Sequence, residues 1–348
     1  MKVFVVHASY GEGHKRAAQA LDGVMDAKVI DLLDFCHPWI KKHTSRAYLD
    51  MTRGKGFFWS LLFHSSKFKF SRRSLDIFCG AVFYAFLRYL RFEKPDVVVV
   101  THPFVTPILL ELKKELNFKI IVVVTDIKVH PWWVYAGVDH YFAALEETKN
   151  DLVAQGVDSA RISYGFVPVR PGFWQKHDQA ALRKKIGVDD KPCIMFISSI
   201  RGKFPYLKGL LATLSGKYNL LVVCGRNEKY MKQINELNLP SVKAFGFYEA
   251  MWELVASCSI LVTKPGGLTI FEGMAQKRLF IFTHFIPGQE KDNMSILISK
   301  HIGAYPRTRE EFLAVVDRFS VLSRDGDFQY PVVVNDMRPE LERIIKTF

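Results

Sequence analysis

Short apolar runs rich in Val, Ile and Phe alternate with longer helical patterns along the chain. This alternation is typical of parallel α/β layers, in which helices connect successive strands of one sheet. The chain has 348 residues, more than the ~250–300 at which a single core stops growing, so we expect two domains. The predicted strands are residues 3–7, 27–31, 97–101, 120–125, 140–143 and 161–164 in the first half, and residues 193–198, 219–224, 242–245, 260–263 and 279–282 in the second.

The segment 167–171, Val-Pro-Val-Arg-Pro, is the best boundary between the two halves. Each proline fixes its own φ and restrains the residue before it, so this segment is extended and stiff. We therefore expect a first Rossmann-like domain over residues 1–170 and a second over residues 171–330. The remaining residues, 331–348, include a helical pattern at the C-terminus.

A strand, a Gly-Gly turn and a helix follow one another over residues 260–272. This arrangement points backbone N–H groups and the positive end of a helix at one spot, which suits a diphosphate. Glu272, about one turn into the helix, can accept hydrogen bonds from ribose hydroxyls. Gln289 and Asn293 lie four apart, so a helix would present both amides on one face. An ordinary strand–turn–helix joint is the alternative, and the second polar cluster favours a nucleotide-sugar site over it.

These two motifs resemble the donor site of the monogalactosyldiacylglycerol synthase and diacylglycerol glucosyltransferase group, in glycosyltransferase family 28. The resemblance extends in the right order from about residue 3 to about residue 303, through the loop Gly11-Glu12-Gly13-His14, the pair Thr125-Asp126, the segment 167–171 and Gly225-Arg226-Asn227. It implies the GT-B architecture, two Rossmann-like domains facing a cleft, with residues 331–348 returning to the first domain. It also implies donor-binding roles for Gly225, Arg226, Phe247, Gly266, Gly267, Leu268, Thr269, Glu272, Gln289 and Asn293.

One loop departs from the family. Residues 198–203, Ser-Ser-Ile-Arg-Gly-Lys, stand where the family usually has a Gly-Gly-Ser type of turn. Without those glycines, close backbone contact with a phosphate is less favourable. Arg201 or Lys203 would then supply a side-chain contact instead, and a solvated charged turn is an equal alternative.

Three residues are candidates for the catalytic base. His14 follows the first glycine loop at the start of a helix, where an imidazole is expected to titrate near neutral pH and Gly13 allows close approach to the acceptor. His102 and Asp126 each follow a predicted strand at its carboxyl end, where open α/β sheets place ligands. The resemblance favours His14 as the base or as a residue that orients the acceptor, over an ordinary helix cap or surface histidine. From their positions, His102 is interpreted as an acceptor-side residue, with a simple loop histidine as an equal alternative, and Asp126 as a residue that orients a histidine or binds a sugar hydroxyl.

His130, Trp132 and Trp133 form a second acceptor-side group. Exposed tryptophans favour a partner such as the interfacial region of a bilayer or a lipid glycerol. The alternative is that one of the two rings belongs to the core.

The net charge of +13 is concentrated in one part of the chain. Residues 41–94 carry twelve Lys or Arg against three Asp or Glu, and thirteen aromatic residues. A basic surface alone would also suit nucleic acid, but basic residues interleaved with aromatic ones favour an anionic bilayer. The predicted membrane-binding residues are Phe57, Phe58, Trp59, Lys67, Lys69, Arg72 and Arg73.

No apolar run approaches the roughly 20 residues that span a bilayer, and the first strand begins at once, without a signal-peptide pattern. The five scattered cysteines form neither a metal-binding spacing nor an even disulfide set. We therefore expect a peripheral protein on the cytoplasmic face of the membrane.

The resemblance implies an inverting hexosyltransferase that moves galactose or glucose from a UDP-sugar to the hydroxyl of diacylglycerol. It further implies that the UDP-sugar is a co-substrate and that catalysis needs no metal ion or other cofactor. The alternatives are N-acetylglucosaminyl transfer to a polyprenyl-diphosphate lipid, a UDP-sugar 2-epimerase of the same architecture, and a membrane scaffold without activity. The Pro-Gly-Gln-Glu-x-x-Asn motif at 287–293 favours the glycerolipid branch, and an epimerase needs no basic aromatic segment.

Overall fold

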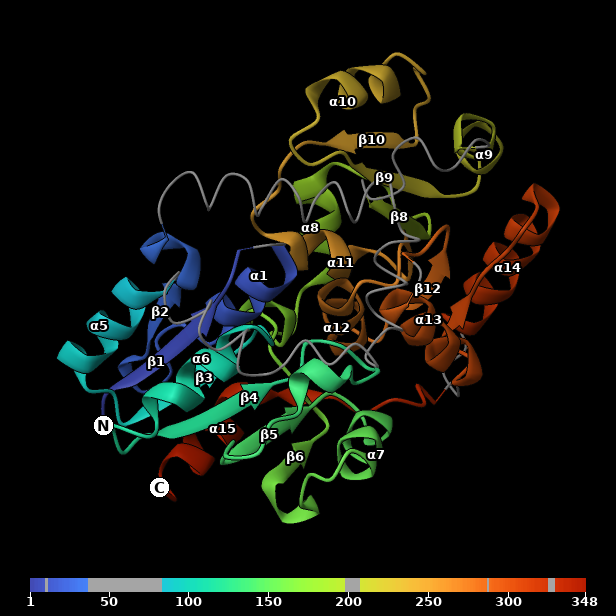
Figure 1. Ribbon diagram of the computed structural model, residues 1–348. Helices are drawn as coiled ribbons and strands as arrows, with labels where there is room; N and C mark the ends of the chain where they lie inside the picture. The colour runs from blue at the N-terminus through green and yellow to red at the C-terminus, as the bar shows by residue number, and fades with distance from the viewer. Residues whose placement is uncertain (10–11, 37–82, 198–206, 287, 325–328) are drawn as a thin grey trace.

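The computed structural model describes residues 1–9, 12–36, 83–197, 207–286, 288–324 and 329–348. Within them, two six-stranded sheets are paired in parallel throughout and lie side by side, connected by helices (Figure 1). The predicted α/β fold class is therefore confirmed. None of the described helices combines the length and the apolar character that crossing a membrane requires.

The first sheet has the strand order β2-β1-β3-β4-β5-β6. The four central strands β1, β3, β4 and β5 are fully or largely buried, as parallel strands covered by helices are, whereas the edge strands β2 and β6 are partly exposed. Successive side chains pack on opposite sides of the sheet. Val5 and Val99 belong to one buried cluster, whereas Val6 and Val100 belong to another. The strands are β1 (Val3–His7), β2 (Lys28–Asp31), β3 (Val97–Val100), β4 (Lys119–Val123), β5 (His140–Ala143) and β6 (Ile162–Tyr164).

Helices cover both faces of this sheet. Phe86 of α5 and Leu109 of α6 pack in the cluster that contains Val6, and Ala18 of α1 packs in the cluster that contains Val5. The helices of the first half are α1 (Glu12–Ala20), α5 (Tyr84–Glu93), α6 (Val105–Leu112) and α7 (Glu146–Ala154).

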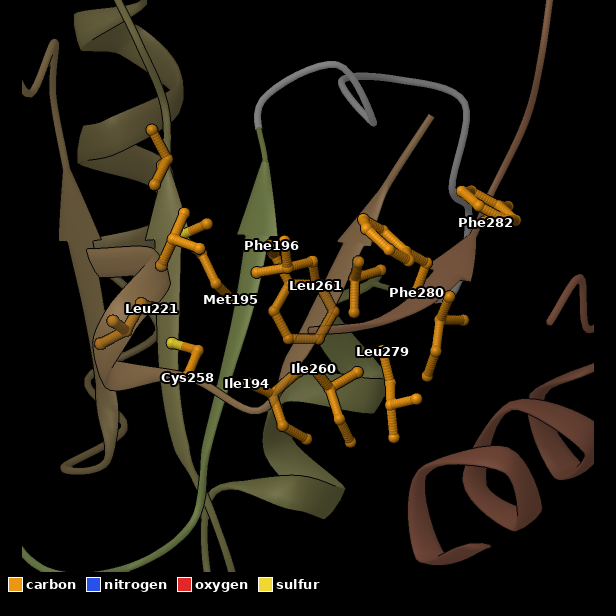
Figure 2. Close-up of a cluster of buried hydrophobic side chains, with 14 of the residues drawn as sticks. Ile194, Met195, Phe196, Leu221, Cys258, Ile260, Leu261, Leu279, Phe280 and Phe282 are labelled. Carbon is orange, nitrogen blue, oxygen red and sulfur yellow. The ribbon is translucent and has the colours of Figure 1, made fainter. Parts of the chain in front are cut away.

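The second sheet has the order β10-β9-β8-β11-β12-β13, and its strands belong to the largest hydrophobic cluster among the described residues. Ile194, Ile260 and Leu279 are register partners on adjacent strands, and Figure 2 shows their side chains in one row. The strands are β8 (Cys193–Ile197), β9 (Asn219–Val223), β10 (Val242–Phe245), β11 (Ile260–Thr263), β12 (Leu279–Phe282) and β13 (Gly303–Ala304). The helices are α8 (Gln179–Ile186), α9 (Leu207–Leu214), α10 (Glu228–Asn235), α11 (Met251–Ser257), α12 (Gly267–Ala275), α13 (Gln289–Ser299) and α14 (Arg309–Leu322).

The C-terminal residues cross back to the first sheet. Strand β14 (Asn335–Asp336) pairs in parallel with β7 (Phe166–Val167). Helix α15 (Met337–Ile345) then buries Leu341 and Ile345 in the cluster that contains Val5. The C-terminal helix therefore packs on the first sheet, and the domain bounds 1–170, 171–330 and 331–348 stay predictions.

Every predicted strand is present, with bounds within two residues of those expected from the apolar runs. The sequence did not reveal β7, β13 and β14, each of which has two residues. Such short strands have no apolar pattern of their own, since the partner strand alone defines them.

Candidate active site

A pocket of about 220 Å³ opens between the two sheets, where helix α1 of the first half meets helix α12 of the second. Its second-half residues lie at or after the carboxyl ends of β8, β9, β10 and β11, the usual place for a ligand in an open α/β sheet. The lining residues are Glu12, Gly13, Arg16, Ile197, Val223, Gly225, Gly246, Phe247, Tyr248, Met251, Leu268, Thr269 and Glu272.

Helix α12 directs its N-terminus at this pocket. β11 ends at Thr263, and the helix begins at Gly267 with no side chain capping its first turn. The first backbone N–H groups of a helix have no partner within the helix and carry a partial positive charge. Leu268 and Thr269, which belong to this first turn, line the pocket, so an anion such as a diphosphate would find donors there.

Phe247 presents an aromatic face in the same pocket. Its side chain is 51% exposed, so part of the ring remains open to a ligand. The guanidinium carbons of Arg226 and Arg16 lie 5.2 Å and 6.0 Å from its ring centroid. The ring and its flanking cations can stack a planar base while they attract a negatively charged group.

Glu272 places a buried carboxyl group at the pocket wall. Its residue is 6% exposed, and it makes no hydrogen bond with any residue that the structure describes. Burial raises its pKa to about 7, against the opposing effect of Arg16 and Arg170. A buried carboxyl group without a partner is suited to a ligand's hydroxyl groups, which would satisfy it.

His14 lies on the first-half side of the cleft with a fixed ring orientation. Its Nδ1 is 2.8 Å from the Thr101 carbonyl oxygen and 3.0 Å from Thr125 Oγ1. A carbonyl oxygen only accepts, so Nδ1 carries the proton and Nε2 keeps its lone pair. Burial lowers the pKa of His14 to about 4. The expected titration near neutral pH is therefore wrong, because desolvation opposes the charged imidazolium.

His102 packs directly against His14, with ring centroids 4.4 Å apart in an edge-to-face arrangement. Its residue is 3% exposed, and its Nδ1 accepts a hydrogen bond from the backbone N–H of Phe104. Burial, and then the neighbouring His14 and His7, lower the pKa of His102 well below its ordinary value. His14 and His102 are thus both held in the neutral form, and together with His7 they form a histidine cluster at the carboxyl ends of β1 and β3.

Asp126 follows β4 and turns toward the second half of the chain. Burial raises its pKa to about 7, the nearby Glu290 adds to this effect, and hydrogen bonds from Asn293 and Gln289 oppose it. The Asp126 carboxyl group thus accepts hydrogen bonds from the side-chain amides of Asn293 and Gln289 on helix α13, and Lys264 lies nearby. A carboxyl group poised near pH 7 is well matched to proton transfer.

Asn293 joins the two halves of the chain, which corrects its predicted role as a sugar ligand. It is fully buried, and its Oδ1 accepts hydrogen bonds from the backbone N–H groups of Ile127 (3.1 Å) and Lys128 (3.3 Å). Its amide nitrogen donates to the Pro265 carbonyl oxygen (3.3 Å) and to the Asp126 carboxyl group. Gln289 and Asn293 do share a helix face, but that face meets the first domain, so no amide group of Asn293 remains for a sugar.

Gly267 also serves the contact between the halves. A Cβ atom at this position would lie 2.0 Å from the Thr125 carbonyl oxygen, a distance that no side chain tolerates. A glycine is therefore required for the first-domain loop to approach the start of α12. Gly266 lies beside the Lys264–Glu290 ion pair, and neither of these glycines lines the pocket.

We expect Asn293→Ala to destabilise the protein more than it changes the affinity for UDP. The substitution leaves buried backbone N–H groups unpaired, which costs ~1–3 kcal/mol, or roughly 2–4 °C in Tm for each kcal/mol. Thermal unfolding of the variant would show this, with Gln289→Ala as the control from the same helix face. An unchanged Tm together with weaker UDP-sugar binding would instead restore Asn293 as a sugar ligand.

The two tryptophans differ in their environment. Trp133 is 1% exposed and lies in the first-sheet core, with its ring centroid 6.2 Å from that of His14. Its predicted place at a membrane or acceptor surface is wrong, since the short helix over residues 131–133 turns this ring inward. Trp132 is partly buried against Phe104 (5.2 Å) and His130 (4.9 Å). His130 is itself 7% exposed and caps that helix through the backbone N–H of Trp132.

Several predicted residues lie outside the described part of the chain, and their roles stay predictions. They are Phe57, Phe58, Trp59, Lys67, Lys69, Arg72 and Arg73, together with Arg201 and Lys203 of the departing loop.

Sequence reasoning missed Arg16, His7, Lys264 and Glu290. Arg16 and His7 stand within or beside the first glycine loop, where residue type alone gave them no role. The Lys264–Glu290 ion pair joins the two donor motifs across the carboxyl ends of β11 and β12, and Glu290 also accepts from the backbone N–H of Ile286 (2.8 Å). A search for opposite charges in the two motifs would have found this pair.

Comparisons with solved structures show the fold. MurG of Acinetobacter baumannii superimposes with a TM-score of 0.62 and 13% identity, over 100% of this chain and 99% of that one. UDP-GlcNAc 2-epimerase of Methanocaldococcus jannaschii gives 0.56 and 14% over the full length of both chains. HepE of Anabaena, solved in complex with UDP, gives 0.55 and 12% over 100% of this chain and 95% of that one. The predicted GT-B architecture is confirmed by these matches.

Comparisons of sequence show the family. The family described as monogalactosyldiacylglycerol (MGDG) synthase matches residues 14–169. A processive diacylglycerol beta-glucosyltransferase of Bacillus mycoides is 30% identical over 328 residues, which cover 90% of this chain and 84% of the relative. The corresponding protein of Bacillus cytotoxicus is 30% identical over 325 residues, 89% of this chain and 82% of the relative. The chain belongs to the monogalactosyldiacylglycerol synthase family and is a homologue of the processive diacylglycerol β-glucosyltransferases.

Proposed function

We propose that this protein is a hexosyltransferase that moves glucose from UDP-glucose to the hydroxyl group of diacylglycerol, with inversion at the anomeric carbon. The observation that supports this most is the pocket between the sheets, where an exposed aromatic ring, a buried carboxyl group and an uncapped helix N-terminus converge. The relatives' glucosyl activity favours glucose over galactose.

The donor is proposed to lie along α12. Uracil stacks on Phe247, the ribose hydroxyls donate hydrogen bonds to Glu272, and the diphosphate meets the backbone N–H groups of Leu268 and Thr269. Stacking of a base on an aromatic ring contributes ~1–3 kcal/mol. Helix N-termini and guanidinium groups neutralise the departing UDP, so we also propose that the reaction needs no metal ion.

The acceptor is proposed to approach from the histidine cluster. The hydroxyl group of diacylglycerol gives its proton to His14 Nε2 or to the Asp126 carboxylate. Its oxygen then forms a bond to the anomeric carbon on the side opposite the diphosphate, and the bond from that carbon to UDP breaks. A single displacement of this kind inverts the configuration, and its rate depends on holding oxygen, carbon and leaving group in line.

Labelled UDP-glucose and UDP-galactose, each incubated with the protein and diacylglycerol vesicles, would test the function. We expect labelled monoglucosyldiacylglycerol and free UDP, with less product from UDP-galactose. Release of UDP-ManNAc from UDP-GlcNAc without a lipid would instead identify an epimerase, and transfer of GlcNAc to a polyprenyl-diphosphate sugar would identify the other lipid branch. No product with any donor, together with intact UDP binding, would indicate a membrane scaffold without activity.

The protein is further proposed to bind the cytoplasmic face of the membrane as a peripheral protein. Within the basic aromatic segment of residues 41–94, helix α5 exposes Tyr84 (60%), Arg88 and Phe92 (84%) at four-residue spacing. Residues at this spacing lie on one helix face. An exposed face that combines aromatic and basic side chains suits an anionic bilayer interface.

We expect the double variant Arg88→Glu, Phe92→Asp to bind anionic vesicles more weakly. Each basic residue near such a surface contributes about 1 kcal/mol, and the added charges are repelled. Flotation of the protein with phosphatidylglycerol vesicles measures the effect. Val321→Asp, at a site that is 69% exposed on α14, is the matched control. Wild-type binding by the double variant would show that α5 does not face the membrane.

A further inference from the structure

Arg16 belongs to the first half of the chain but lines the pocket that the second half mostly builds. It stands on α1, three residues after Gly13, so both residues occupy the same helix face. That face packs against α12: a Cβ atom on Gly13 would lie 4.0 Å from the Cβ of Leu268, in the first turn of α12. The Arg16 side chain therefore extends along the pocket beside the uncapped helix N-terminus.

The Arg16 guanidinium differs from that of its neighbour Arg170 in its hydrogen bonds. It makes no hydrogen bond and no ion pair with any residue that the structure describes, and its recorded ring contact is with Phe247, at 6.0 Å. Arg170, by contrast, donates to Glu249 through Nη1 (2.8 Å to the carbonyl oxygen, 3.0 Å to Oε1) and lies over Trp252. With respect to the described residues, Arg16 therefore has all its donors available, whereas Arg170 uses Nη1 for Glu249.

We propose that Arg16 is a donor-binding residue, which bonds the diphosphate of the nucleotide sugar across the cleft. This inference rests on the proposed function and adds a residue of the acceptor-side sheet to the donor site. A diphosphate carries more negative charge than one helix N-terminus neutralises, and guanidinium groups bind phosphate oxygens through two parallel hydrogen bonds. Since Arg16 and Leu268 belong to different halves of the chain, a diphosphate held by both joins the two domains.

Titration calorimetry with UDP and with uridine would test this assignment. We expect Arg16→Ala to weaken UDP binding by roughly ten- to a hundredfold, the usual loss of a hydrogen bond to a charged group, and to leave uridine binding within about twofold. Arg16→Lys should recover part of the loss, because lysine keeps the charge but not the bidentate geometry. Lys15→Ala is the matched control, since it removes the same charge from the same helix at a position that does not line the pocket.

Each outcome decides the matter. UDP binding by Arg16→Ala that equals the wild type would overturn the proposal, and so would an equal loss for uridine and UDP, which would assign Arg16 to the base. If the wild type binds UDP and Arg16→Ala does not change its affinity, this inference fails while the proposed function stands. If the wild type does not bind UDP, both fail. Steady-state kinetics gives a second readout, because Arg16→Lys should raise the KM for the donor and leave the KM for diacylglycerol unchanged.

Discussion

The His14→Ala protein is expected to lose turnover by ~10²–10⁴-fold, the usual contribution of a positioned proton acceptor, while it binds UDP nearly as tightly as the wild type. The ring is fixed by the Thr101 carbonyl oxygen and packs against His102, so Nε2 is held in one place. His14 itself does not line the nucleotide pocket. Initial rates on diacylglycerol vesicles and a UDP titration on the same sample measure the two effects.

The pH dependence of kcat/KM distinguishes His14 from Asp126 as the base. A base is active when deprotonated, so the rate falls on the acid side of its pKa. With a pKa of about 4 for His14, the rate should stay level from pH 8 down to about pH 5. With a pKa of about 7 for Asp126, it should already fall below about pH 7.

Asp126→Asn completes the test. If His14 is the base, this variant should keep most of the turnover. Asparagine has the same shape as aspartate and can still hydrogen-bond with the amides of helix α13. A value of kcat/KM that stays level down to about pH 5, in the wild type and in Asp126→Asn, would support His14 as the base. An acid limb near pH 7 that vanishes in Asp126→Asn, together with near-normal turnover of His14→Ala, would transfer the role to Asp126.

The Glu272→Gln protein is expected to bind UDP and UDP-glucose roughly ten- to a hundredfold more weakly, because the ribose hydroxyls lose a charged acceptor. At the same time its unliganded form should be more stable than the wild type at pH 8. The pKa of Glu272 is raised to about 7 by burial, so the folded protein holds a proton that the unfolded chain has lost in the window between about 4.5 and 7. Stability therefore falls as pH rises through that window, and the glutamine removes this loss.

Thermal unfolding at pH 8 and at pH 4 measures the second effect. We expect a higher Tm for Glu272→Gln at pH 8, by roughly 2–4 °C for each kcal/mol of charge burial removed, and no gain at pH 4. Glu236→Gln, at an exposed carboxylate of the same half, is the control for losing one negative charge. A variant with normal UDP affinity would place the ribose elsewhere. A lower Tm at pH 8 would show that the carboxylate stabilises the fold.

The sequence by itself determined the α/β class, the strands of both sheets except β13, and much of the donor pocket. Strand positions follow from apolar runs, a local signal that does not depend on how the two sheets meet. Gly225, Phe247, Leu268 and Thr269 gather with Glu272 at the pocket because each follows a parallel strand, and the carboxyl ends of parallel strands share one edge. Their grouping therefore required only the correct strands.

Only the tertiary structure determined the contacts between the two halves of the chain. Helical spacing placed Gln289 and Asn293 on one face, but the packing of the domains turned that face toward Asp126 and paired every group of Asn293. Gly267 likewise meets the Thr125 carbonyl oxygen. Spacing along one helix cannot reveal these contacts, since it carries no information on which distant segment packs against the helix.

Burial determined the pKa shifts in the site and the position of Trp133. Desolvation depends on all surrounding atoms, so the sequence could not show that the pKa of His14 falls to about 4 while those of Asp126 and Glu272 rise to about 7. The same enclosure put Trp133 in the core. Arg16 reaches Phe247 from a helix more than 200 residues earlier in the chain, because two separately specified sheets pack against each other at this pocket.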